Sequence, residues 1–148
     1  MNVKAREASP ENAVSNHLVK ADYVRLSLFR HGLRQFLRIS ERICRDQGLT
    51  PLQYQLLLHV RGSPERDWAS ISELAERLQA QHHGVVALID RCEKLGLVVR
   101  QSGSQDRRMV EIHLLPAGEE LLERIAILHQ DDLHQLLSTL PSSQPVNC

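Results

Sequence analysis

The chain has 148 residues, 42% of them hydrophobic, which suits one compact domain. Its 18 basic and 18 acidic side chains give zero formal net charge, which excludes a uniformly basic coat and disorder driven by self-repulsion. The charges are nevertheless segregated. Residues 24–46 hold six basic and two acidic side chains, residues 77–108 six and three, and residues 109–148 one and six. This pattern fits a protein with one face for a polyanion and another for a second copy of itself.

Aromatic and cysteine residues narrow the class further. Single-stranded nucleic acids are bound by stacking on several aromatic rings, and this chain has only five: Tyr23, Phe29, Phe36, Tyr54 and Trp68. Its three widely spaced cysteines (Cys44, Cys92 and Cys148) indicate a reducing compartment rather than a disulfide scaffold. With neither a membrane-spanning apolar run nor a signal peptide, we expect a cytoplasmic protein. Polar residues 1–16 and 141–148 are expected to be mobile ends.

The first predicted helix covers residues 22–46. Its apolar side chains recur every three or four positions, the pattern of an amphipathic helix: Leu26, Phe29, Leu33, Phe36, Leu37, Ile39 and Ile43. A second face carries Arg30, Arg34, Arg38 and Arg42 at four-residue steps, as either a solvated face or a ligand or phosphate site. Beyond Gly48, Thr50 and Gln53 form a capping box around Pro51, predicting a helix over 51–61.

A helix-turn-helix follows. Ser70 and Glu73 form a second capping box, which opens a short helix that runs through Leu78. The turn 79–81 leads into a helix over 82–95, with Gly96 as its C-terminal stop. The spacing predicts that this second helix turns five side chains inward: Val85, Leu88, Ile89, Cys92 and Leu95.

The period then changes to that of a β-hairpin. Residues 97–102 and 109–114 read as strands, joined by a polar tip at 103–108. Pro116 begins a further helix, with a continuation to Leu140. The predicted fold is therefore mainly α with a small β-hairpin wing. A helix-turn-helix with a basic wing is a winged helix, a module that reads duplex DNA.

These stretches together resemble the multiple-antibiotic-resistance regulator (MarR) family. The resemblance covers residues 22–138 and rests on Leu49–Pro51, Ser72–Leu78, Asp90–Val98, Asp106–Arg108 and Leu114–Gly118. It implies a homodimer in which residues 17–46 and 116–140 form dimerisation helices and residues 50–115 form the winged-helix lobe. The apolar stripes of the first and last helices, too extensive for one protomer to bury, agree with a dimer. The resemblance also implies a repressor controlled by a small, often phenolic or anionic, molecule in the crevice between the dimer helices and the lobe.

Candidate DNA contacts follow from the outward positions of the second helix and from the wing. In and beside that helix they are Gln81, His82, His83, Val86, Ala87, Arg91 and Lys94. In the wing they are Arg107 and Arg108, and Asp106 is expected to fix the tip by pairing with one of them, Arg108 by the family pattern. The expected partner is a pseudo-palindromic duplex with half-sites about one helical turn apart.

The sequence also bears on four other functions. A metal site is disfavoured because His82 and His83, as neighbours on a helix, point about 100° apart, and we expect no metal and no cofactor. A thiol switch through Cys44 stays open, since a thiol near the end of an arginine-rich helix can have a lowered pKa. So does an interaction module without DNA binding. The chain shows no phosphate loop, nucleophile elbow or zinc-protease motif, so an enzyme is not expected.

Overall fold

The computed structural model describes residues 17–140, so the expected mobile ends lie outside the described residues. The elements occur in the order α1 (Lys20–Asp46), α2 (Pro51–Arg61), β1 (Trp68–Ser70), α3 (Ile71–Leu78), α4 (His82–Lys94), β2 (Val98–Ser102), β3 (Val110–Leu114), α5 (Pro116–Leu128) and α6 (Gln130–Ser138). The mainly helical class with a hairpin is confirmed. The helix expected from Pro116 is α5, and its expected continuation is α6, with His129 between the two.

Both capping boxes are present. The Thr50 hydroxyl accepts the Gln53 amide at 3.2 Å, and the Gln53 side-chain oxygen accepts the Thr50 amide at 2.9 Å. Ser70 and Glu73 exchange the equivalent pair of bonds at 3.2 and 2.8 Å. Each box satisfies backbone amides that would otherwise have no helical partner, which explains why α2 and α3 begin where they do.

The sheet has three strands in the order β1-β3-β2, all antiparallel. In this register Trp68 lies opposite His113, Ser70 opposite Glu111, and Val98 opposite Leu114. The sequence predicted the β2–β3 hairpin but not β1, because three residues are too few to show an alternating pattern. Strand β1 joins the wing to the start of α3, since Ser70 is both its last residue and the cap of that helix.

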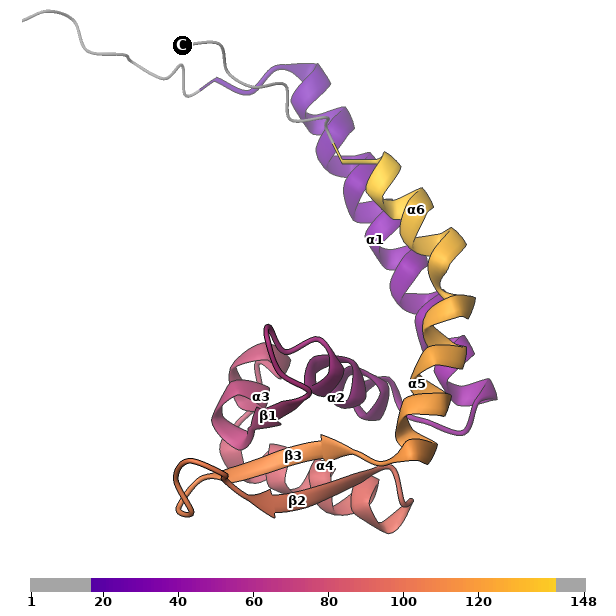
Figure 1. Ribbon diagram of the computed structural model, residues 1–148. Coiled ribbons are helices and arrows are strands. Elements are labelled where there is room, and N and C mark those ends of the chain that lie inside the picture. The colour runs from indigo at the N-terminus through magenta and orange to yellow at the C-terminus, as the bar shows by residue number, and fades with distance from the viewer. Residues whose placement is uncertain (1–16, 141–148) are drawn as a thin grey trace, which may run out of the picture.

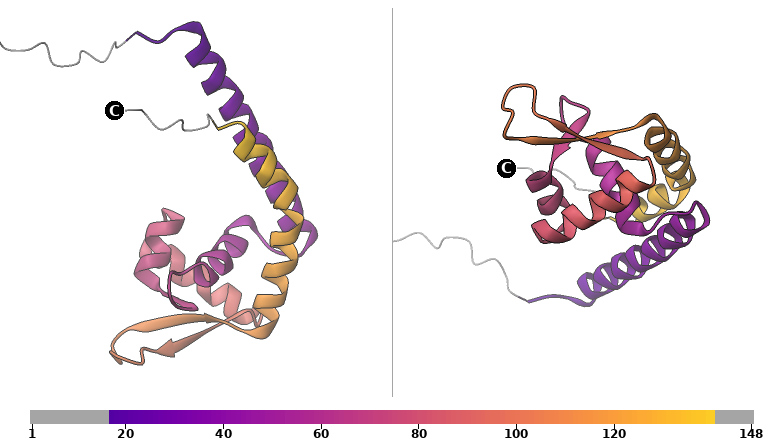
Figure 2. Two further views of the ribbon diagram at one scale, coloured as in Figure 1. Left: turned by 45° about the horizontal axis from the view of Figure 1, so that its top comes forward. Right: turned by 90° about the horizontal axis from the view of Figure 1, so that it is seen from below.

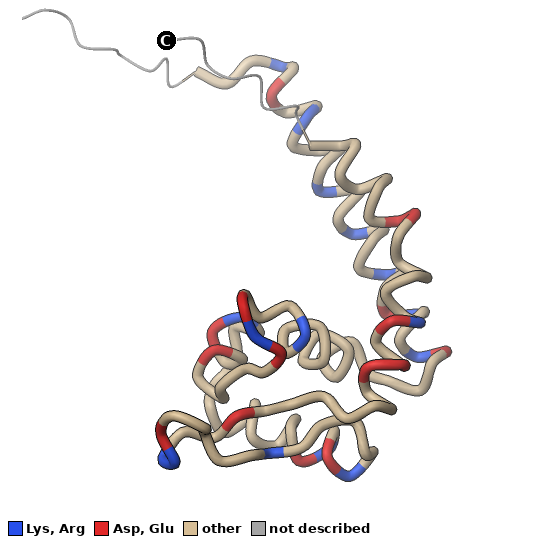
Figure 3. Tube along the Cα trace, in the orientation of Figure 1, with Lys and Arg blue, Asp and Glu red and all other residues tan. Residues whose placement is uncertain are grey.

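The molecule consists of a winged lobe and an arm. Strands β1–β3 and helices α2–α4 form the lobe, while α1 and the nearly collinear α5 and α6 lie side by side and project from it (Figures 1 and 2). Basic positions recur along α1 (Figure 3), and the arginines at 30, 34, 38 and 42 are all exposed. No helix within residues 17–140 combines the length and the apolar character that crossing a bilayer requires.

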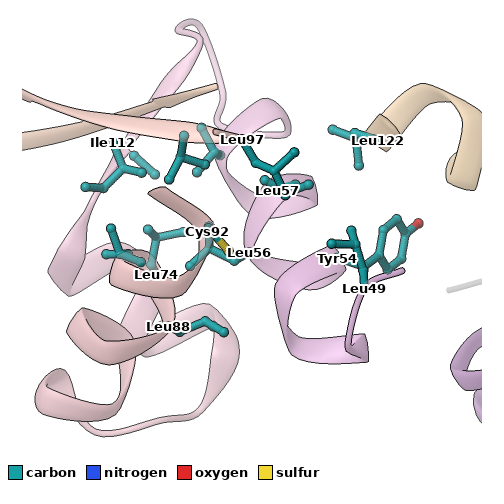
Figure 4. Close-up of a cluster of buried hydrophobic side chains, with 14 of the residues drawn as sticks. Leu49, Tyr54, Leu56, Leu57, Leu74, Leu88, Cys92, Leu97, Ile112 and Leu122 are labelled. Atoms are coloured by element: carbon teal, nitrogen blue, oxygen red, sulfur yellow. The ribbon is translucent and has the colours of Figure 1, made fainter. Parts of the chain in front are cut away.

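The hydrophobic core sits in the lobe and under the base of the arm. Figure 4 shows side chains from α2, α3 and α4 meeting those of the wing strands. Its fully buried members include Leu56, Leu57, Leu74, Ile89, Cys92, Val98 and Ile112. The expectation that Leu95 points inward is wrong, because its side chain is 53% exposed. Since α4 ends at Lys94, Leu95 leaves the helical face, and Leu97 enters the core instead.

Candidate nucleic-acid interface

Helices α3 and α4 form the predicted helix-turn-helix. The turn depends on Gln79, whose φ of +49° places a non-glycine residue in the left-handed region. The Gln79 side-chain amide donates to the Glu76 carbonyl at 2.6 Å, and the Ala80 amide donates to the Ala75 carbonyl at 3.0 Å. These bonds close α3 and redirect the chain into α4, which begins without a side-chain cap at Gln81.

The outer face of α4 carries most of the candidate contacts. Its exposed members are Gln81, His82, His83, Ala87, Arg91 and Lys94. Val86 differs, because its side chain is half-buried. Gly84 has open space around the position of a side chain, so no packing within the described residues requires a glycine there.

The wing tip is held by its own backbone. The Gly103 amide donates to the Met109 carbonyl at 2.8 Å, and the Met109 amide donates to the Asp106 carbonyl at 3.0 Å. A Cβ at Gly103 would lie 2.3 Å from the Asp106 carbonyl oxygen, so the turn requires glycine. The Asp106 carboxylate accepts the backbone amide of Arg108 at 2.9 Å.

This last contact corrects the expected role of Asp106. Its partner is Arg108, as the family pattern suggested, but the bond is made by the amide and not by the guanidinium. Within residues 17–140 the side chains of Arg107 and Arg108 join no ion pair, and both are exposed. Both guanidinium groups are therefore available to an external anion.

Wing and helix-turn-helix border one hollow. It has a volume of about 550 Å³ and is lined by Ser70–Ser72, His82, Asp106 and Arg108–Val110. The start of α3, the start of α4 and the wing thus converge on the same space. This arrangement brings His82 and Arg108, which lie 26 positions apart in the sequence, to one concave surface.

Comparison with known proteins shows which family has this architecture. Residues 47–109 match the model of the MarR family. The HTH-type transcriptional regulator YkoM of Bacillus subtilis is 31% identical over 109 residues, which cover 70% of this chain and 68% of YkoM.

The chain belongs to the MarR family.

Solved structures agree on the MarR fold. AbsC, a MarR family transcriptional regulator from Streptomyces coelicolor, superposes with a TM-score of 0.68 at 22% identity, covering 86% of each chain. A mutant of MepR from S. aureus, bound to an oligodeoxyribonucleotide, superposes with a TM-score of 0.61 at 21% identity, covering 84% of this chain and 87% of that one. The protein is accordingly a DNA-binding transcriptional regulator of the MarR family and not an enzyme.

The sequence analysis did not predict the role of Arg100, which links the wing to α4. Arg100 of β2 pairs with Glu93 and, at 2.6 Å, with Asp90, and its backbone amide donates to Glu93 at 3.0 Å. Arg100 therefore fastens the wing to α4 and neutralises two carboxylates on that helix. The sequence shows only that Asp90 and Glu93 lie three positions apart on α4, which does not identify Arg100 as their partner.

A second network ties the wing to α3. The Glu111 carboxylate accepts the Ser104 amide at 3.2 Å and contacts His113 Nε2 at 2.8 Å, and these bonds hold the Glu111 pKa below its usual value. His113 lies against Trp68, over which Arg66 stacks at 4.0 Å. Arg66 in turn pairs with Glu73, which completes the capping box of α3 by accepting from the Ser70 amide.

Neither Cys44 nor Cys92, the two cysteines within residues 17–140, supplies a reactive thiol. Cys44 and Cys92 are fully buried, and burial raises the pKa of both, that of Cys92 to about 11. The lowered pKa expected for Cys44 is therefore wrong, because desolvation outweighs the bond from Ser40 that favours the thiolate. Within the described part of the chain no three His, Cys, Asp or Glu side chains converge as metal ligands.

Proposed function

We propose that the protein is a homodimeric repressor that binds a pseudo-palindromic duplex and releases it when a small effector binds. The observation that carries this proposal is the shared hollow, where His82 at the start of α4 and Arg108 of the wing meet. A helix fits the major groove, and a wing arginine reaches phosphates or the narrow minor groove beside it. The oligodeoxyribonucleotide bound to the MepR mutant supports duplex DNA as the partner.

The first turn of α4 is assigned to base readout. His82 and His83 are exposed there and can donate to base or phosphate acceptors, while half-buried Val86 leaves only part of its surface for a thymine methyl. Arg91 and Lys94, farther along α4, face the phosphate backbone in this assignment, and Gln81 and Ala87 complete the contact face. Arg107 and Arg108 add wing contacts, with Asp106 fixing the tip.

Dimerisation is assigned to the arm, residues 17–46 and 116–140, with residues 50–115 as the reading lobe. Along α1 several apolar side chains are open to solvent in the protomer: Tyr23, Val24, Leu26, Leu28 and Leu37. Helices α5 and α6 expose a second set: Ile127, Leu128, Leu133, Leu137 and Leu140. Exposed apolar surface of this kind is buried when two copies pack together.

Control by a small effector is a further part of the proposal. Bound at the promoter, the dimer excludes other proteins from that DNA. A small phenolic or anionic molecule in the crevice between arm and lobe lowers occupancy only if it binds better to a state whose two α4 helices are wrongly spaced for DNA. The exposed arginines of α1 at positions 30, 34, 38 and 42 favour an anionic ligand near that helix.

The decisive experiment is fluorescence anisotropy with duplexes tiled across the region upstream of the protein's own gene. Each duplex is titrated at two salt concentrations beside a scrambled duplex of equal composition, and sedimentation gives the mass of the protein. Tight, salt-sensitive binding that rejects the scrambled duplex is expected. Absence of binding to any duplex at low salt would instead support an interaction module.

A further inference from the structure

The connection between arm and lobe is centred on one buried histidine. His129 lies between α5 and α6 and is only 4% exposed. Its ring stacks on that of Tyr54 from α2, with centroids 5.0 Å apart and planes 2° from parallel. Phe36 of α1 approaches the same ring at 6.0 Å with a tilt of 58°. The imidazole thus contacts aromatic rings from the arm and from the lobe.

Hydrogen bonds fix the orientation of that ring. Nδ1 lies 2.8 Å from the Ile125 carbonyl oxygen in α5, and Nε2 lies 2.8 Å from the Ser40 hydroxyl in α1. A carbonyl oxygen only accepts, so Nδ1 donates to Ile125, and the second bond joins Nε2 to the Ser40 hydroxyl. With both nitrogens bonded and both faces near rings, the imidazole has one orientation, and it determines how α1, α2 and α5 meet.

The position of this junction lets it affect how the lobe, and with it α4, is oriented relative to the arm. Helix α2 belongs to the lobe, whereas α1 and α5–α6 form the arm, and α4 lies on the far side of α2 from the junction (Figures 1 and 2). A small rotation of the lobe about the contact between Tyr54 and His129 would therefore displace α4. In a symmetric dimer the displacement occurs in both copies, so it changes the separation of the two recognition helices.

We propose that His129 is a positioning residue that sets the separation of the two α4 helices, and thereby the half-site spacing that the protein selects. This inference rests on the proposed function, because it requires a dimer that binds two half-sites. In this inference His129 contributes to operator selection without contacting a base, because it positions the helices that do.

The test uses His129→Gln, with His134→Gln as the matched control. His134 is exposed on α6, so the same substitution there leaves the junction intact. Duplexes carrying the recovered half-sites are prepared with centre-to-centre spacings that differ by single base pairs around one helical turn, and competition titrations give the preferred spacing. We expect His129→Gln to move the optimum by at least one base pair, about 3.4 Å along the axis, or to flatten it. His134→Gln is expected to keep the wild-type optimum.

A weakening that is equal at all spacings would overturn the inference, since it is the result of a merely structural role. Ser40→Ala guards against a variant that fails to fold, because it removes one hydroxyl, with its bonds to Nε2 and to the Cys44 thiol, and leaves both rings of the stack unchanged. Ser40→Ala is expected to shift or flatten the spacing optimum as His129→Gln does, but by a smaller amount. An unchanged preference in a folded Ser40→Ala protein and in His129→Gln contradicts the proposal.

A second readout needs no DNA. Spin labels at Glu76→Cys, an exposed position on α3, report the distance between the two lobes of the free dimer in a Cys148→Ser background. Cys44 and Cys92 are buried and stay unlabelled. We expect a shifted or broadened distance in His129→Gln and the wild-type distance in His134→Gln. The same distance in both variants overturns the inference, whereas the absence of any distance between copies overturns the proposed function as well.

Discussion

The lobe and the arm begin from similar amphipathic patterns and reach different states. The lobe buries its apolar side chains within one chain, and helices α2 and α4 together contribute Tyr54, Leu56, Leu57, Val60, Val85, Leu88, Ile89 and Cys92. In the 27 residues of α1 only Cys44 is fully buried, and in α6 no residue is. The lobe therefore completes its hydrophobic core within one chain, whereas the arm keeps much of its apolar surface exposed in the protomer.

The largest effect should follow from placing a charge in the arm. Leu37 is 55% exposed in the protomer, so Leu37→Asp leaves the lobe folded but places two carboxylates in the proposed symmetric interface. The lost burial of two half-exposed leucines, together with the desolvation of two unpaired carboxylates, predicts dimerisation weaker by roughly 3–6 kcal/mol. Sedimentation equilibrium measures this change, and anisotropy should show a parallel loss of DNA binding.

Leu52→Asp is the control for that variant, because Leu52 is similarly exposed but lies on α2 in the lobe. If both variants stay dimeric, the apolar surface of the arm is not the interface.

Truncation in the lobe core should have the next largest effect. Leu74 is fully buried in α3, and Leu74→Ala is expected to lower the free energy of unfolding by about 2–5 kcal/mol. Leu37→Ala, the same substitution in the arm, should cost much less at protein concentrations where the chain is monomeric. Urea denaturation followed by circular dichroism compares the two, and equal losses would contradict the contrast between lobe and arm.

Wing substitutions should change DNA binding by a smaller amount and leave folding intact. Arg107→Ala and Arg108→Ala each remove a guanidinium that has no ion-pair partner within residues 17–140. Each should cost roughly 1–3 kcal/mol on every sequence, and the slope of log affinity against log salt should fall by about 0.9 per lost phosphate contact.

His83→Ala sharpens this assignment, because it should change the preference among operator variants instead. Unchanged salt slopes in both arginine variants would remove the wing from the interface.

The smallest effect concerns pH. Burial alone would raise the pKa of Glu73, but the Ser70 amide and Arg66 bind its carboxylate and hold the pKa below the ordinary value. The stability that this provides is present above the unfolded-state pKa and is lost as the pH falls through the folded-state pKa. The partly exposed pair should contribute only about 0.5–1 kcal/mol.

Glu73→Gln keeps an acceptor for the capping box but removes the charge that pairs with Arg66. The variant should therefore be less stable than wild type at pH 7, and the difference should shrink in acid. Glu76→Gln, a change at an exposed position of the same helix, serves as control in thermal denaturation. A difference between wild type and Glu73→Gln that does not shrink as the pH falls would show that ionisation of Glu73 contributes nothing.

Local signals determined what the sequence could predict. Caps at Thr50 and Ser70, the period of α4 and the hairpin all depend on neighbours in the chain, and their positions agree with the structure. Contacts between distant residues were missed, because neither the bond of Arg100 to Asp90 nor the stack of His129 on Tyr54 leaves a periodic trace. Burial misled the sequence reasoning at Leu95, where the helix ends, and at Cys44, where desolvation governs the pKa.

The two capping boxes also bear on how the chain acquires its structure. Helices α2 and α3 close their first turns with bonds between residues three positions apart, which lowers the cost of nucleation before any distant contact exists. Helix α6 has no side-chain cap, and none of its residues is buried in the protomer. Folding should therefore start in the lobe and reach the ends of the arm last, so that in the proposed dimer the winged lobes form before the arms associate.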